Sequence, residues 1–169
     1  MNTIYTIGHS TRSIEFFVEL LLFYKIQVLV DVRAYPGSKR YPHFNKENLE
    51  KDLPKSGIRY VHMPELGGRR KPLPDSKNEV WKNPMFRGYA DYMETEEFKA
   101  AIEKLKDTAG KETTCIMCSE AVWWRCHRSL IADYLKKDGW EVLHIMEKNK
   151  LQTHPYTAPM REMQSRLDF

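Results

Sequence analysis

The stretch IQVLVDVR, residues 26–33, decides the fold that this sequence predicts. It is a continuous apolar run apart from Gln27 and Asp31, which is typical of a strand covered on both faces in a parallel sheet. Such a strand needs helices above and below it, so an α/β architecture follows. The run ends in Asp31 and Arg33, which alternate along the strand and therefore point to the same side at its end.

The segments on either side of this run alternate between strand and helix. Residues 4–7 form a short β-branched and aromatic run that Gly8 closes, and Ser13 is placed to cap the helix that follows. The further predicted strands cover residues 58–63, 113–117 and 140–145, and the predicted helices cover residues 14–24, 46–55, 89–93, 96–108 and 126–137. Gly110 is expected to end the fourth of these helices. We therefore predict an α/β fold with a mainly parallel sheet and helices on both faces, a Rossmann-like three-layer sandwich with right-handed crossovers.

Two regions lack a clear period. Residues 64–85 contain Gly67 and Gly68, four prolines and a cluster of basic side chains, which indicates a long irregular loop and a candidate lid. The segment from about Glu147 onward contains Pro155 and Pro159 and little periodicity, so we expect an irregular tail, either an edge elaboration or a partly disordered segment.

Length and composition indicate one soluble domain over residues 1–169, long enough to fold without a disulfide or a metal. Cys115, Cys118 and Cys126 are too few and too closely spaced for a disulfide framework, so they are interpreted as thiols in a reducing, cytoplasmic setting. No segment resembles a signal peptide or a membrane span. The net charge of +4 is only mildly basic, but residues 33–87 hold 13 Lys or Arg against 6 Asp or Glu, interleaved with aromatic residues. That region favours an anionic partner.

Polar residues follow three of the predicted strands where each strand ends. His9 and Ser10 follow the first strand, and Cys118 and Glu120 follow the strand at residues 113–117. Ligands of open parallel sheets bind at the carboxyl ends of the strands, so these residues should share one edge with Asp31 and Arg33. The sequence therefore predicts a functional site at this edge.

The helix predicted from residue 126 begins at the same edge, with Cys126, His127 and Arg128 in its first turn. Backbone N–H groups at a helix N-terminus, flanked by Arg125 and Arg128, favour a phosphate or carboxylate and lower the pKa of a thiol at Cys126. Glu120 is placed to act as a general acid or base. We predict catalytic roles for His9, Asp31, Cys118, Glu120, Cys126 and His127, and substrate-binding roles for Ser10, Arg33, Arg69, Arg70 and Arg128.

Several motifs carry a resemblance to a known family. They are TIGHST at residues 6–11, DVR at 31–33 with PGS at 36–38, PELGG at 64–68, FRGY at 86–89, and CSE at 118–120 with CHR at 126–128. Through them the chain resembles the domain of unknown function 488 (DUF488) family over nearly its whole length. The resemblance implies a family with no demonstrated reaction, although some of its members carry the label of DNA repair protein.

Structural interpretations stand beside the functional ones. Cys118 and Cys126 can be small buried hydrophobic residues, can pair as a disulfide if the loop folds back, or can bind a metal with His127, although their spacing is not a standard zinc pattern. Asp31 and Arg33 can serve in a structural ion pair with a neighbouring residue, and the His9 imidazole can bond only backbone. Cys115 is assigned to the core.

The basic loop and the tryptophan pair have two interpretations as well. Arg69 and Arg70 can be solvated side chains or can clamp a charged substrate beside the glycines that precede them. Trp123 and Trp124 are interpreted as anchors of their loop, and exposure of both would favour base stacking instead.

Three functions remain open. The first is an enzyme that acts on a nucleotide-like or phosphate-bearing substrate through the Cys, Glu, His and Arg side chains. The second is a nucleic-acid-binding protein, associated with DNA repair, in which residues 33–87 meet the phosphate backbone and the cluster is structural. The third is a thiol-based redox or metal-responsive module. The sequence assigns no cofactor, no metal, no membrane partner and no oligomeric state.

Overall fold

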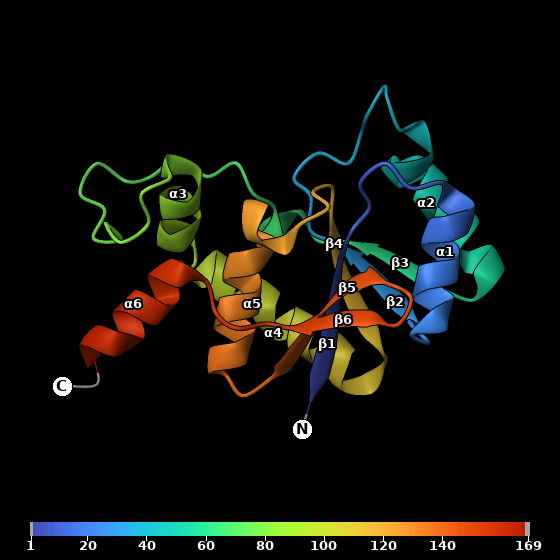
Figure 1. The fold of residues 1–169 in the computed structure, drawn as a ribbon. Helices are drawn as coiled ribbons and strands as arrows, with labels where there is room; N and C mark the ends of the chain where they lie inside the picture. Colours follow the sequence, from blue (N-terminus) through green and yellow to red (C-terminus); the bar gives the residue numbers. More distant parts are fainter. Residues whose placement is uncertain (1, 168–169) are drawn as a thin grey trace.

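The structure is a computed structural model that describes residues 2–167. Its centre is a six-stranded open sheet in the order β3-β2-β4-β1-β5-β6 (Figure 1). The strands are β1 Thr3–Gly8, β2 Val28–Asp31, β3 Arg59–His62, β4 Thr114–Cys118, β5 Glu141–Glu147 and β6 Lys150–Thr153. All strand pairs are parallel except β5 with β6, which is antiparallel. The predicted α/β class with a mainly parallel sheet is confirmed.

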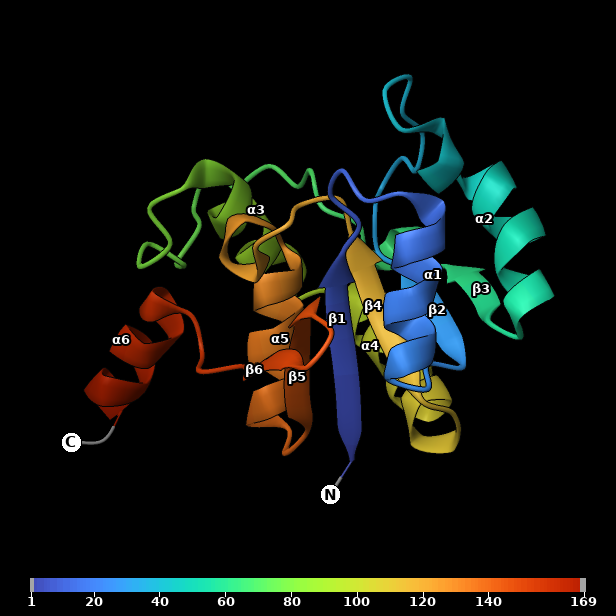
Figure 2. The same cartoon turned by 45° about the vertical axis from the view of Figure 1, so that its right-hand side comes forward.

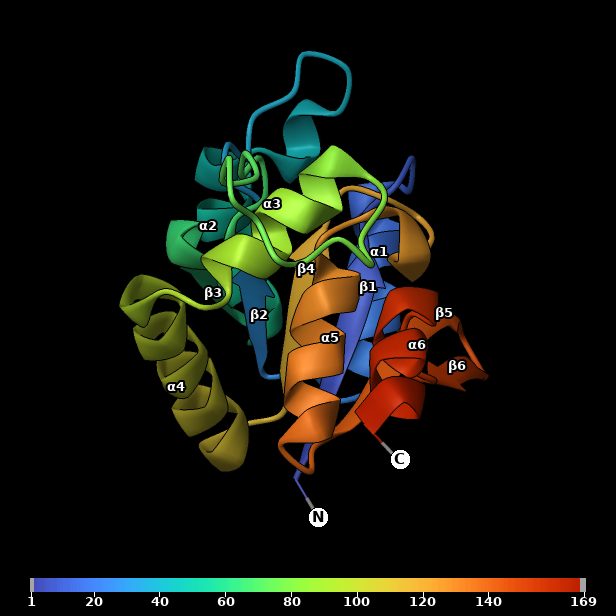
Figure 3. The same cartoon turned by 90° about the vertical axis from the view of Figure 1, so that its left-hand side faces the viewer.

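Helices cover both faces of the sheet. They are α1 Ile14–Phe23, α2 Lys46–Asp52, α3 Pro84–Tyr92, α4 Glu96–Lys111, α5 Arg128–Lys137 and α6 Ala158–Leu167. The helices α1 and α2 lie on one face, and α4 and α5 lie on the other, with α3 above α5 (Figures 2 and 3). In the described chain, no helix combines the length and the hydrophobicity that a membrane crossing requires.

The central strands are apolar on both sides because each side meets a different helix layer. In β2, Val28 and Val30 pack into the cluster under α4 and α5, whereas Leu29 packs into the cluster under α1. In β4, Ile116 faces the first cluster and Met117 faces the second. The run that predicted a doubly covered strand therefore lies in the middle of the sandwich, between two separate hydrophobic layers.

Several helix bounds differ from the predicted ones: α2 ends at Asp52, and α5 begins at Arg128, so Cys126 and His127 precede that helix instead of lying in its first turn. The helix α3 begins five residues earlier than expected, because Asn83 caps it by accepting a hydrogen bond from the Met85 amide and Pro84 fits the first turn. The prediction that Gly110 ends α4 is wrong, since the helix continues to Lys111. The apolar face that packs on the sheet holds this last turn despite the helix cost of glycine, about 1 kcal/mol.

The segment after Glu147 is regular where the sequence predicts an irregular tail. A turn with Asn149 in the left-handed region (φ 59°) leads into β6, which pairs with β5. All four residues of β6 are exposed, so the strand has no alternation of apolar and polar residues that a sequence pattern could detect. Between Gly67 and Asn83, by contrast, the predicted irregular loop is present.

The end of β1 allows only glycine. A Cβ atom on Gly8 would lie 1.6 Å from the carbonyl oxygen of Glu120, a backbone atom that cannot rotate away. We expect Gly8→Ala to lower the free energy of unfolding by about 3 kcal/mol or more, the upper end for overpacking. Urea denaturation would measure the change. Gly37→Ala is the matched control and should be nearly neutral, because nothing lies within 4 Å of its Cβ position. Equal stability of the two variants would contradict this account.

Candidate functional site

The carboxyl ends of β1 and β4 carry the loops of the site side by side. Gly8 is level with Cys118, and the parallel pairing continues beyond both strands. The His9 amide donates to the Cys118 carbonyl at 2.9 Å, and the Ser10 amide donates to the Ser119 carbonyl at 3.0 Å. Ser10 adopts φ 52°, which turns the chain away from the sheet after this second bond. The structure thus brings the first and fourth strand ends into contact.

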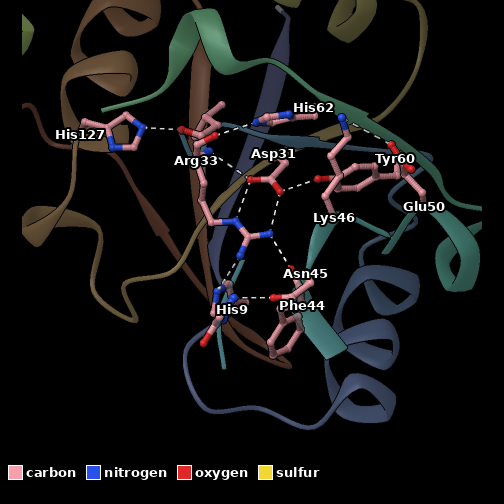
Figure 4. A network of polar contacts seen from close by, with 12 residues as sticks. His9, Asp31, Arg33, Phe44, Asn45, Lys46, Glu50, Tyr60, His62 and His127 are labelled. Carbon is pink, nitrogen blue, oxygen red and sulfur yellow. Dashed lines mark hydrogen bonds and ion pairs between the residues drawn. The ribbon is translucent and has the colours of Figure 1, made fainter. Parts of the chain in front are cut away.

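Asp31 and Arg33 at the end of β2 form a buried ion pair (Figure 4). The Arg33 Nε and Nη2 atoms donate to the two Asp31 oxygens at 2.9 and 2.7 Å, in the bidentate geometry that arginine favours with carboxylates. Asp31 also accepts the Tyr60 hydroxyl at 2.6 Å, and Arg33 Nη2 donates to the Phe44 carbonyl at 2.6 Å. Asp31 is fully buried. These contacts engage the Asp31 carboxylate entirely within the protein.

His9 lies behind this ion pair. Its ring stacks on Phe44 with centroids 4.3 Å apart, its Nδ1 contacts the Ser10 carbonyl at 2.9 Å, and its Nε2 faces Arg33 Nη1 at 3.3 Å. Because a carbonyl only accepts, Nδ1 carries the proton and Nε2 accepts from Arg33. The pKa of His9 is lowered to about 4, mainly by burial and also by the Arg33 charge, while the bond to Ser10 acts in the opposite direction. His9 is therefore neutral at pH 7.

Cys118 and Cys126 form the second centre. Cys118 ends β4, Cys126 lies two residues before α5, and their Sγ atoms lie 2.7 Å apart although both are free thiols. Burial would raise the pKa of Cys118, but the hydrogen bond from Cys126 and the Arg128 charge outweigh it, so this pKa is lowered. The predicted lowering of the Cys126 pKa is wrong, because burial and the neighbouring Cys118 raise it. Of the two coupled thiols, Cys118 is therefore the one that loses its proton more readily.

Arg128 is 1% exposed and contacts the Glu120 carbonyl that Cys118 Sγ also contacts. Its Nη2 atom donates to the carbonyls of Glu120 at 3.1 Å and Ala121 at 3.3 Å, and its Nη1 atom faces the Thr6 hydroxyl at 3.5 Å. Its Nε is buried without a hydrogen-bond partner in the described chain. The partners of this guanidinium are thus neutral oxygen atoms, and the backbone amide of Arg128 donates to Cys126 Sγ at 3.3 Å.

His127 stands between the two centres. Its Nε2 contacts the Val32 carbonyl at 2.7 Å, so Nε2 carries the proton and Nδ1 is the acceptor. Burial lowers the pKa of His127 to about 4, with the charge of Arg128 adding to the effect. A Cβ atom on Gly68 would come within 3.0 Å of Nδ1, so the glycine lets residues 67–68 lie against this imidazole.

A cavity of about 320 Å³ opens above the thiols. Its lining residues are Arg33, Ala34, Tyr35, Gly68, Arg69, Met85, Phe86, Tyr89, Cys118, Ser119, Glu120, Arg125, Cys126 and His127. The charged side chains among them are the three arginines and Glu120. Tyr35 at the rim is 73% exposed, and the Arg69 guanidinium lies 5.2 Å from the centre of its ring. The cavity has a thiol floor and a rim that is mainly basic and aromatic.

The predicted site residues occupy different places around this cavity. Arg33, Arg69, Cys118, Glu120, Cys126 and His127 line it. His9, Ser10, Asp31, Arg70 and Arg128 do not. Arg70 stacks on Tyr92 at 3.6 Å and donates to the Gly67 carbonyl, away from the thiols. The Glu120 side chain is exposed, whereas its backbone carbonyl is held by Arg128.

The sequence pattern missed the wall that the start of α3 contributes. Met85, Phe86 and Tyr89 lie in or next to the FRGY motif, whose glycine is the signal that could have placed them. A Cβ atom on Gly88 would lie 2.0 Å from the Arg70 carbonyl, so this glycine permits α3 to approach the loop. Arg125 lines the cavity too, from the turn before Cys126.

The described chain offers thiols, imidazoles and guanidiniums rather than an evident metal centre. In residues 2–167, no group of three or more His, Cys, Asp or Glu side chains is arranged to hold a metal ion. Trp123 is buried and Trp124 is 50% exposed, so one member of the tryptophan pair anchors the loop and the other faces outward.

Comparison with known proteins adds a family. A family model described as "Domain of unknown function DUF488" matches residues 13–135, which is more than half of the chain. The matched segment includes β2, β4, Cys118, Cys126 and Arg128. The searches of curated proteins and of solved structures gave no match.

The buried histidines predict acid sensitivity. The pKa of His9 is about 4 in the folded protein and about 6.5 when unfolded, so the unfolded state gains a proton first as the pH falls. The stability from neutral His9 is present above pH 6.5 and is lost toward pH 4, by roughly 2.5 kcal/mol at pH 4.5. Urea denaturation at pH 7 and pH 4.5 should show a smaller loss for His9→Gln than for the wild type. Identical losses would mean that His9 is not kept neutral by the fold.

Proposed function

Because this chain belongs to the DUF488 family, whose description names no activity, we propose a function from its own geometry: it is an enzyme that acts on a small phosphate-bearing substrate through a thiolate of the Cys118–Cys126 pair. The single observation that carries the proposal is the contact of the two thiols at the cavity, where Cys118 Sγ shares the Glu120 carbonyl with the buried guanidinium of Arg128, which has no carboxylate partner among residues 2–167.

The buried charge of Arg128 favours a thiolate. A guanidinium taken out of water loses several kcal/mol of hydration, which neutral carbonyl partners replace only in part. A negative charge on Cys118 compensates this buried charge, and the same attraction lowers the pKa of the Cys118 thiol. Arg128 therefore stabilises the thiolate electrostatically and does not bind the substrate itself.

The cavity rim suits an anion. Arg69 and Arg125 are exposed side chains at the cavity, where guanidinium groups can pair with phosphate oxygens. Tyr35 offers an exposed ring for a flat group such as a nucleobase. A volume of about 320 Å³ is at the small end of ligand pockets, which fits a nucleotide-sized molecule or less.

In the proposed reaction, Cys118 Sγ attacks an electrophilic atom of the substrate and forms a covalent bond to it. The leaving group takes the proton of the Cys126 thiol as its bond breaks. Water then cleaves the bond to Cys118, returns one proton to Cys126 and restores the Cys118 thiolate. Glu120 and the Nδ1 atom of His127 line the cavity and can orient that water as hydrogen-bond acceptors. His9, Asp31 and Arg33 form the framework that fixes the neighbouring strand end.

Alkylation kinetics test the thiolate. Iodoacetamide should modify Cys118 in the folded protein with an apparent pKa below the ordinary thiol value of about 8.5. Cys126→Ala removes the hydrogen bond to Cys118 and should slow its alkylation at pH 7 by about tenfold, one pKa unit. Mass spectrometry of peptides would follow each site. Cys115, which is fully buried, should stay unmodified and is the internal control. An ordinary pKa at Cys118 would remove the thiolate from the mechanism.

The same assay tests the substrate class. Inorganic pyrophosphate or adenosine monophosphate should slow the alkylation of wild-type Cys118 by occupying the cavity. The double variant Arg69→Gln and Arg125→Gln should lose this protection while keeping the unprotected rate within about twofold, since neither side chain touches the thiols. Protection that persists in the double variant would locate the anion elsewhere.

A second candidate function, a two-electron redox centre, is favoured by the sulfur contact itself. Sulfur atoms 2.7 Å apart need little movement to reach the disulfide length of about 2.05 Å. Forming that bond removes two protons and two electrons from the pair, and an external disulfide or diazene oxidant would accept them.

Oxidation by diamide distinguishes this candidate. The redox function predicts a mass loss of about 2 Da that dithiothreitol reverses and that Cys118→Ser abolishes, with Cys115→Ser unchanged. If Cys118 is a nucleophile without a redox role, oxidation should abolish the activity instead. In that case no oxidised intermediate should take part in turnover. Failure of the folded protein to form the bond would exclude the redox candidate.

A further inference from the structure

A continuous line of buried polar side chains runs from the core to the thiol site. The members are Thr6 on β1, His144 on β5, His154 just after β6, and Asp133 on α5, and we call these four residues the Thr6–Asp133 relay. Each is at most 3% exposed. None of them lines the cavity above the thiols, so the proposed reaction leaves this cluster without a role.

The hydrogen bonds of the relay run in one direction. Asp133 Oδ1 contacts His154 Nε2 at 2.7 Å, His154 Nδ1 contacts His144 Nε2 at 2.8 Å, and His144 Nδ1 contacts the Thr6 hydroxyl at 2.5 Å. The Thr6 oxygen faces Arg128 Nη1 at 3.5 Å. A carboxylate only accepts, so His154 Nε2 donates to Asp133, and with both imidazoles neutral each one donates toward Asp133 and accepts from the side of Arg128. The Thr6 hydroxyl then donates to His144, while its oxygen can accept from the guanidinium.

The far end of the relay is anchored firmly. Asp133 accepts the Thr157 amide at 2.9 Å and the Thr157 hydroxyl at 2.6 Å in addition to His154. Burial lowers the pKa of His144 to about 2, with the charge of Arg128 adding to the effect, so His144 stays neutral. A neutral His144 keeps its acceptor nitrogen available to Thr6.

The relay also holds the loop between the two cysteines. The Trp123 ring stacks on His144, with centroids 4.8 Å apart and planes 5° apart, and meets His154 edge-on at 4.9 Å. The indole N–H of Trp123 donates to Gln152 Oε1 at 2.9 Å. Trp123 belongs to the loop whose carbonyls bind Arg128, so the relay fixes both the guanidinium and its acceptors.

We propose that the Thr6–Asp133 relay positions Arg128 so that its charge stabilises the thiolate of the Cys118–Cys126 pair. The inference rests on the proposed function, because it explains how the Arg128 charge that stabilises the thiolate is held in place. The four residues are positioning residues, since none touches the substrate cavity. The negative charge of Asp133 and the positive charge of Arg128 occupy opposite ends of one buried network, which compensates each charge through polarised hydrogen bonds.

Other groups face the thiols as well. The titratable and charged groups around the pair are Cys115 on β4, Glu120 and Arg125 in the following loop, His127 and Arg128 at the start of α5, Arg33 after β2, and Arg69 in the loop before α3. Of these, Arg128 is the one that contacts the relay. A variant of the relay should therefore act on the thiols through Arg128.

The test is the pH profile of Cys118 alkylation by iodoacetamide in three variants. Thr6→Val keeps the shape of the side chain but removes the hydroxyl, and it should raise the apparent thiol pKa by about one unit, a tenfold slower reaction at pH 7. Thr6→Ser restores a hydroxyl and should return the rate to within twofold of the wild type. Asp133→Asn removes the charge at the far end and should slow the reaction about threefold.

A matched control separates positioning from loss of stability. Thr114 on β4 is fully buried like Thr6, but its hydroxyl bonds the Glu112 carbonyl at the opposite end of the sheet. Thr114→Val should leave the thiol pKa unchanged. If Thr6→Val fails to fold, Asp133→Asn carries the same readout. An ordinary pKa in the wild type would overturn the proposed function and the relay together, whereas a lowered pKa that survives both relay variants would overturn the relay alone.

Discussion

The site depends on one buried guanidinium. Arg128 ties two backbone carbonyls of the loop after β4 to the interior, and this fixes the path of the chain between Cys118 and Cys126. The same loop passes so close to β1 that only glycine fits at position 8. Because the loop can neither move toward β1 nor leave Arg128, the second thiol is brought back against the first. The sulfur contact is thus a consequence of how the loop is held.

A comparison of the two buried arginines explains why the chemistry belongs to one of them. Arg33 meets Asp31 in a bidentate ion pair, so its charge is largely compensated by the carboxylate. In the described residues Arg128 bonds only neutral oxygen atoms, and the groups on which its charge acts include the thiol pair. The same residue type therefore has its charge compensated by a carboxylate after β2 and is left without one at the start of α5, within the described residues.

The sequence predicted the sandwich and the edge of the sheet that carries the candidate site, because apolar runs and strand ends are local features. It did not predict which arginine has its charge neutralised. Asp31 could have paired with either Arg33 or Arg128, and the assembled strands decide that it pairs with Arg33. It also missed β6, whose exposed residues show no alternation, and the start of α3, where Asn83 and Pro84 set a boundary that hydrophobic periodicity does not register. Local pattern thus locates the residues, and three-dimensional pairing assigns their electrostatic roles.

The segment after Glu147 has more than an edge role in this arrangement. His154 follows β6 and links His144 to Asp133, and the antiparallel pairing of β6 with β5 is what brings this histidine back into the core. Gln152 within β6 accepts the indole N–H of Trp123 and so reaches the same loop. A strand with four exposed residues contributes little hydrophobic burial of its own. Its contribution is geometric, because without it the polar line that ends at Arg128 would stop at His144, and a buried imidazole would lose its acceptor.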